Sequence, residues 1–91
     1  MLSNLINEVK LLKRHFLILK LVRENEPIGI LRLSELSGIP QHRVRYSLRI
    51  LEQKGVIKPS SKGAVSTKRA ARALESLPGE LRNISKKLNE I

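Results

Sequence analysis

The residues best suited to chemistry in this chain are the cationic and polar side chains of segment 41–54. If the segment is a helix, its apolar residues Val44, Leu48 and Leu51 form one stripe, and the polar residues face away from it. The polar set contains no acid and comprises Gln41, His42, Arg43, Arg45, Tyr46 and Arg49. An arginine fork can pair bidentately with a guanine edge or a phosphate. A helix with such a face fits the major groove of duplex DNA.

Residue combinations typical of catalysis or metal binding are missing from the sequence. The two histidines, His15 and His42, have no cysteine or carboxylate at metal-ligand spacing. There is no Gly-rich phosphate loop and no nucleophile elbow. We therefore expect a protein that is not an enzyme, has no metal or cofactor, and shows no evident small-molecule site. His15 is expected on the surface of its helix.

A helix, a tight turn and a second helix must position the polar face. Gly38 falls where a first helix over 30–37 must end, since Gly enters the left-handed region without steric cost. Pro40 presets φ for the start of the second helix, 41–54. Gly55 ends that helix. Two β-rich pieces within 56–66 then flank a Pro-Ser-Ser-Lys-Gly turn, which predicts a small hairpin.

The motif Leu-Ser-Glu-Leu-Ser-Gly-Ile-Pro at 33–40, followed by Leu-Glu-x-x-Gly-Val-Ile at 51–57, resembles the winged helix-turn-helix family. In size the chain is similar to small archaeal transcription regulators. The resemblance covers about 12–68. It implies a mainly α fold with a small β-hairpin, in which helix 41–54 reads duplex DNA. The flanks lie outside the family motif, and their own residues predict N- and C-terminal helices. The resemblance also implies that Ile28 forms a short first strand.

The hairpin and the segment after it carry a second basic set. In the family such a hairpin, the wing, touches DNA backbone or minor groove, and we expect mainly phosphate contacts here. Basic residues in the first turn of a helix over 68–77 oppose the helix dipole, which indicates an external anion. The expected backbone contacts are Lys58, Lys62, Lys68 and Arg69. Ordinary solvent-facing lysines and arginines remain an alternative.

The charge of the whole chain favours a polyanionic partner. Its 91 residues include 18 Lys and Arg against 8 Asp and Glu, a net charge of +10. A thermophilic or solubility effect is the other interpretation. The only aromatic residues are Phe16 and Tyr46, too few for a base-stacking platform, so duplex DNA is favoured over single strands or RNA. We expect neither a membrane span nor a signal peptide.

We expect one winged-helix domain over 1–91, with an N-terminal helix over 1–24, the helix-turn-helix and wing over 28–66, and a C-terminal helical extension over 67–91. Both flanks carry apolar residues at heptad-like spacing, which favours a symmetric dimer. The expected interface residues are Leu2, Leu5, Val9, Leu12, Leu74, Leu77, Leu81, Ile84 and Leu88. Pairing of the two flanks within one chain is the alternative.

Three functions remain open at this point. The first is a dimeric, sequence-specific regulator of transcription in the cytoplasm, associated with the nucleoid. The second is a winged helix that serves as a protein-interaction module in a transcription, replication or repair assembly. The third is a chromatin-type protein that binds every duplex sequence alike.

Overall fold

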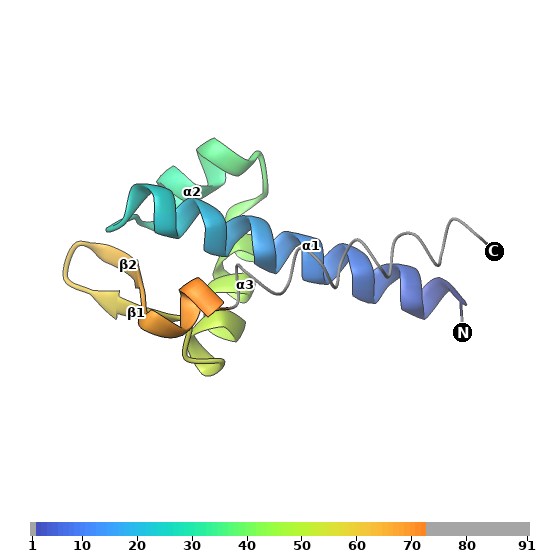
Figure 1. The fold of residues 1–91 in the computed structure, drawn as a ribbon. Coiled ribbons are helices and arrows are strands. Elements are labelled where there is room, and N and C mark those ends of the chain that lie inside the picture. Colours follow the sequence, from blue (N-terminus) through green and yellow to red (C-terminus); the bar gives the residue numbers. More distant parts are fainter. Residues whose placement is uncertain (1, 73–91) are drawn as a thin grey trace.

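In the computed structural model, the described part of the chain is residues 2–72. It contains α1 (Leu2–Asn25), α2 (Ile30–Ser37), α3 (Gln41–Gln53), β1 (Ile57–Ser60) and β2 (Gly63–Ser66) (Figure 1). Residues 68–72 are helical. This is the mainly helical architecture with a two-stranded antiparallel hairpin that the sequence predicts for a winged helix-turn-helix. The rest of the expected C-terminal extension, residues 73–91, lies outside the described residues.

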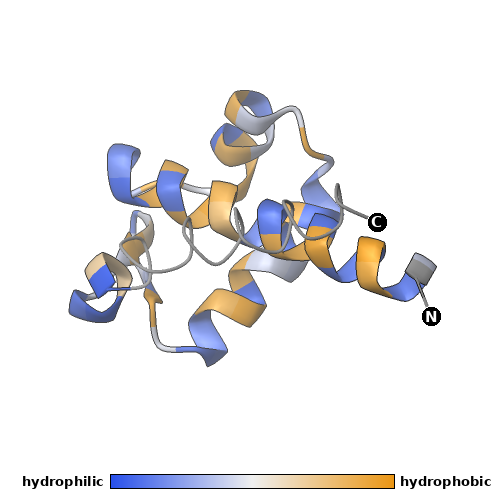
Figure 2. Ribbon diagram, turned by 45° about the vertical axis from the view of Figure 1, so that its right-hand side comes forward, coloured by the Kyte–Doolittle hydropathy of each residue, from blue (hydrophilic) through white to orange (hydrophobic). Residues whose placement is uncertain are grey.

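The first helix is a single element whose C-terminal half enters the core. Ile18, Leu19 and Val22 are completely buried there. The N-terminal half projects beyond the other helices and the wing (Figure 1). Hydrophobic residues continue along this projecting half (Figure 2). The helix ends at Asn25, before Glu26 and Pro27, because a residue that precedes proline disfavours helical geometry.

The turn between α2 and α3 is closed by Gly38 and two serines. Gly38 has φ 72°, and its N–H donates to the Ser34 carbonyl at 2.9 Å. The Ser34 hydroxyl donates to the Ile39 carbonyl at 2.6 Å, and the Ser37 hydroxyl accepts the Ile39 N–H at 3.1 Å. These local bonds satisfy backbone groups that the helix end leaves open, and they fix the direction in which α3 starts.

Each described element except β2 contributes a buried residue to one hydrophobic core. The core members are Ile18, Leu19, Val22, Ile28, Leu33, Val44, Leu51, Val56, Ile57 and Ala70. Complete burial of a side chain such as Leu33 contributes about 1.5–3 kcal/mol. Because Val44 and Leu51 lie on the same side of α3, the opposite side of that helix is left in solvent.

The wing is joined to the segment between α1 and α2. β1 and β2 pair in register from Ile57–Ser66 to Ser60–Gly63. Ile28 then adds an isolated antiparallel bridge to Ala64, with N–H···O distances of 3.1 and 2.8 Å in the two directions. This bridge is the short first strand expected at Ile28. Beyond β2, the Thr67 hydroxyl donates to the Gly55 carbonyl at 2.6 Å, which ties the end of the wing to the end of α3.

Among the glycines of residues 2–72, Gly63 leaves the least room for a side chain. Its φ is 132°, and an added Cβ would lie 2.6 Å from the Ile28 carbonyl carbon. We expect Gly63→Ala to lower the free energy of unfolding by about 2 kcal/mol or more, from backbone strain and the collision together. Gly29→Ala is the matched control, because no atom lies within 4 Å of its added Cβ. Urea denaturation followed by circular dichroism measures both, and equal losses would contradict this account.

Candidate nucleic-acid interface

The exposed face of α3 carries the polar residues that the sequence singles out. Val44, Ser47 and Leu51 are the buried residues of this helix. The whole expected reading set is exposed: Gln41, His42, Arg43, Arg45, Tyr46 and Arg49. The structure therefore brings these six side chains to the solvent side of one helix, while whether each contacts DNA stays a prediction.

No carboxylate of residues 2–72 forms a salt bridge with the arginines of this face. Arg32 and Glu35 on α2 do form one, at 3.2 Å. Both of its side chains are about two-thirds exposed, so the pair contributes little to stability. The guanidinium groups on the exposed face of α3 consequently keep their charge available for an external anion.

The expected backbone-contact residues lie at two places. Lys58 is on β1 and Lys62 is in the turn of the wing, and both are exposed. Lys68 and Arg69 are exposed at the start of the helical segment 68–72. Arg69 also has a contact within the chain, since its guanidinium donates to the Lys54 carbonyl at 3.5 Å. A cation is favoured at this C-terminal end of α3 by the helix dipole, which gives Arg69 a structural explanation besides DNA contact.

A buried polar network that the sequence analysis missed holds α3 against α1. Ser47 is completely buried on α3. Its hydroxyl accepts a hydrogen bond from Arg14 Nε at 3.2 Å, and it lies 2.7 Å from His15 Nδ1. The sequence contains one signal for this network, because Ser47 lies about one turn from Val44 on an otherwise apolar stripe. Such a residue requires a buried polar partner.

His15 is buried, and the expectation that it lies on the helix surface is wrong. It is 9% exposed because α1 packs across α3 at this point. The Ser47 hydroxyl can accept from Arg14 and still donate its own proton to His15 Nδ1, so all three groups are satisfied together. Burial lowers the pKa of His15 below its ordinary value of 6.5, and the charge of Arg14 lowers this pKa further.

Tyr46 connects this network to the exposed face of α3. Its ring lies 5.9 Å from the His15 ring, and the Arg14 guanidinium carbon is 5.9 Å from the Tyr46 ring centroid. The Tyr46 side chain is nevertheless 45% exposed. Contacts with α1 therefore restrain one side of a residue that we expect to meet DNA.

The expected dimer-interface residues divide into those that the structure describes and those it does not. On α1, Leu5 and Leu12 are each 40% exposed, whereas Val9 is buried. Leu2 belongs to α1. The remaining five lie outside the described residues: Leu74, Leu77, Leu81, Ile84 and Leu88.

The described residues contain no cluster of three or more histidine or acidic side chains arranged to bind a metal. None of the helices in residues 2–72 combines the length and apolar character needed to span a membrane.

Comparison with known proteins identifies the family. A family model for winged helix-turn-helix DNA-binding domains matches residues 11–58, more than half of the chain. The chain therefore belongs to the winged helix-turn-helix DNA-binding family. The match contains most of α1, both helices of the helix-turn-helix, and the beginning of β1. No curated protein matches the sequence.

Because the folded state lowers the pKa of His15, acid destabilises the protein. Below about pH 6.5 the unfolded chain takes up a proton that the folded chain resists, so the free energy of unfolding falls as pH decreases towards the lowered pKa. Above the pKa that His15 has in the unfolded chain, its contribution to the free energy of unfolding is fully present. We expect His15→Gln to flatten this dependence above about pH 5, where most carboxylates remain ionised. His42→Gln, at an exposed position on α3, is the control that should retain the dependence in urea denaturation.

Proposed function

We propose that this protein is a sequence-specific regulator of transcription that binds duplex DNA through α3. The observation that carries the proposal is the exposed face of α3, which presents three arginines and one acid, Glu52 in the last turn, and is held on the core by Val44 and Leu51. Arg45 and Arg49 are suited to bidentate contacts with guanine, and His42 and Tyr46 add polar contacts beside them. A rigid, buried attachment favours base reading, because bidentate contacts require fixed geometry.

The wing supports the proposal by offering contacts that carry no sequence information. Lys58 and Lys62 are exposed on the hairpin beside α3 and are suited to phosphates. The net charge of +10 favours association with DNA of any sequence, and therefore localisation to the nucleoid. The similarity in size to small archaeal regulators fits a protein of this type.

The proposed active form is a symmetric dimer. Leu5 and Leu12 leave apolar surface on the projecting half of α1, where a second copy could cover it. A two-fold dimer would place two α3 helices in successive major grooves, roughly 34–36 Å apart. The same apolar surface also favours the second candidate function, a winged helix that binds another protein.

Arginine substitutions on α3 test sequence recognition. We expect Arg45→Ala and Arg49→Ala each to reduce the difference in binding free energy between the preferred duplex and the others. The loss is about 1–3 kcal/mol if the arginine makes a bidentate contact with guanine. Lys62→Ala, a matched loss of one charge on the wing, should weaken all duplexes alike and reduce the salt slope by about 1. Fluorescence anisotropy across a panel of duplexes measures both effects. If neither arginine variant changed the ranking of the panel, α3 would not be the reading helix.

Analytical ultracentrifugation tests the dimer. We expect a mass near twice 10.3 kDa at tens of micromolar, and dissociation of the Leu12→Lys variant into monomers. Leu31→Lys is the control, since Leu31 is 65% exposed on α2 and not on the proposed interface. A wild-type monomer at this concentration would remove the dimer from the proposal while leaving DNA binding by α3 intact.

A further inference from the structure

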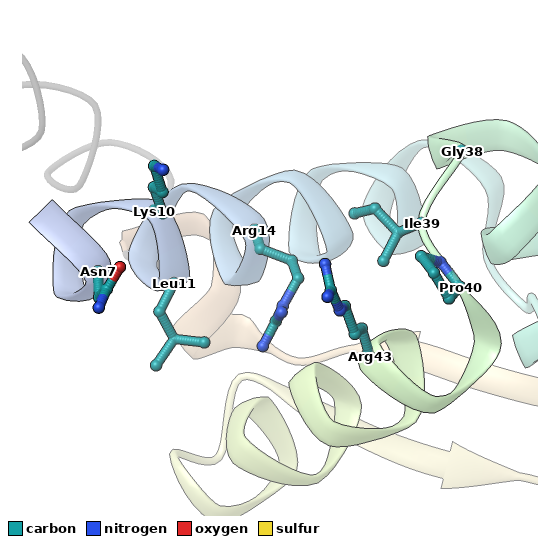
Figure 3. Close-up of a pocket in the computed structure, with 8 residues that line it drawn as sticks. All are labelled: Asn7, Lys10, Leu11, Arg14, Gly38, Ile39, Pro40 and Arg43. Carbon is teal, nitrogen blue, oxygen red and sulfur yellow. The ribbon is translucent and has the colours of Figure 1, made fainter.

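A basic hollow lies on the flank of α3 that faces α1. It has a volume of about 360 Å³ and is bordered by α1 and by the turn that leads into α3. Its cations are Lys10, Arg14 and Arg43, and its lining contains no acid. Figure 3 shows Arg14 extending from α1 towards α3, and Arg43 extending from α3 towards α1. Two guanidinium groups that share one hollow repel each other unless an anion lies between them.

The orientation of Arg14 is fixed by contacts that leave its two terminal nitrogens available. Its Nε donates to Ser47 at 3.2 Å, and its guanidinium lies over the Tyr46 ring. Within residues 2–72, no carboxylate pairs with Arg14 or Arg43. The pair is therefore partly preorganised for a ligand with several acceptor oxygens, and a phosphate has this chemistry.

The position of the hollow relative to the wing indicates where the phosphate comes from. At about 100° per residue, Arg43 and Glu52 point in opposite directions around the axis of α3. Glu52 lies on the flank beside Lys58 of the wing, and Arg43 lies on the flank beside α1. A helix inserted in the major groove has a DNA strand along each flank, because the groove is about 12 Å wide. The wing can meet one strand and the hollow the other.

We propose that Arg14 and Arg43 bind one phosphate of the DNA backbone in this hollow, on the flank of α3 opposite the wing. The inference rests on the proposed function and changes one expectation from the sequence: Arg43, expected among the base-reading residues, contacts backbone. Lys10, which points away from α3 in Figure 3, lies at the rim and adds charge without being required. The hollow thus extends the DNA contact surface from α3 onto α1.

The test is an anisotropy titration of the full chain with a panel of fluorescent duplexes at several salt concentrations. We expect Arg43→Gln and Arg14→Gln each to weaken every duplex about tenfold, without changing their ranking. The double variant should lose about 0.9 from the salt slope, the value for one phosphate. Lys13→Gln is the matched control, because this exposed lysine of α1 does not line the hollow, and its effect should stay below about twofold.

Other outcomes would overturn the inference. Arg14 and Arg43 variants no weaker than the Lys13 variant would remove the phosphate site, while a changed ranking for Arg43→Gln would make Arg43 a base-reading residue. A slope loss of about 1.8 in the double variant would mean two separate phosphates. Arg43 is exposed, so its variant remains informative even if Arg14→Gln perturbs folding, which circular dichroism would detect.

A further arm distinguishes DNA from a free anion. Thermal unfolding of the wild type in inorganic phosphate is compared with unfolding in chloride at equal ionic strength. Stabilisation by phosphate that Arg43→Gln abolishes, together with an unchanged DNA salt slope, would assign the hollow to a small anion and contradict the DNA proposal. Failure of the proposed function has a separate readout, since it would appear as an unchanged duplex ranking for the Arg45 and Arg49 variants.

Discussion

The proposed DNA-binding surface depends on the packing of α1 across α3. The C-terminal half of α1 packs in the core through Ile18, Leu19 and Val22, and one side of α3 packs in the same core through Val44 and Leu51. Because that side of α3 is buried, its arginines project into solvent from the opposite side. Ser47 adds direction to this apolar contact, because its hydroxyl must meet both Arg14 and His15 at defined distances. Apolar burial alone is non-directional and would tolerate rotation of α3.

The sequence was sufficient to predict the helices and strands between residues 2 and 66 and the exposed side of α3. Gly38 and Gly55 marked helix ends through their backbone requirements, and Val44 and Leu51 marked the buried side through their spacing. The buried polar network was not predictable by the same reasoning. A helix wheel treats each helix alone, whereas the burial of His15 depends on the crossing of α1 and α3, which brings together residues 32 positions apart. For the same reason, spacing alone did not show that Arg14 and Arg43 share a hollow.

In the proposed complex, different surfaces of the protein contact different parts of the major groove. Bases would meet the outer face of the helix, one backbone strand would meet the wing, and the other would meet α1. Apolar positions are exposed on the projecting half of α1, on the same helix that lines the hollow, and in the proposed dimer a second copy would cover them. In this arrangement a dimer contact and a backbone contact would both act on α1, so dimerisation and DNA affinity would be linked through one rigid helix.

In the proposed function, α3 reads a specific duplex sequence. The most direct test is to incubate the wild-type protein with a random duplex pool at moderate salt and sequence the bound fraction. We expect enrichment of a short site made of two inverted halves, one helical turn or a multiple of it apart. A bound fraction with the composition of the starting pool would contradict specific reading and support a chromatin-type protein. An absence of binding at about 50 mM salt, where a protein of this charge should hold duplex DNA, would contradict DNA recognition altogether.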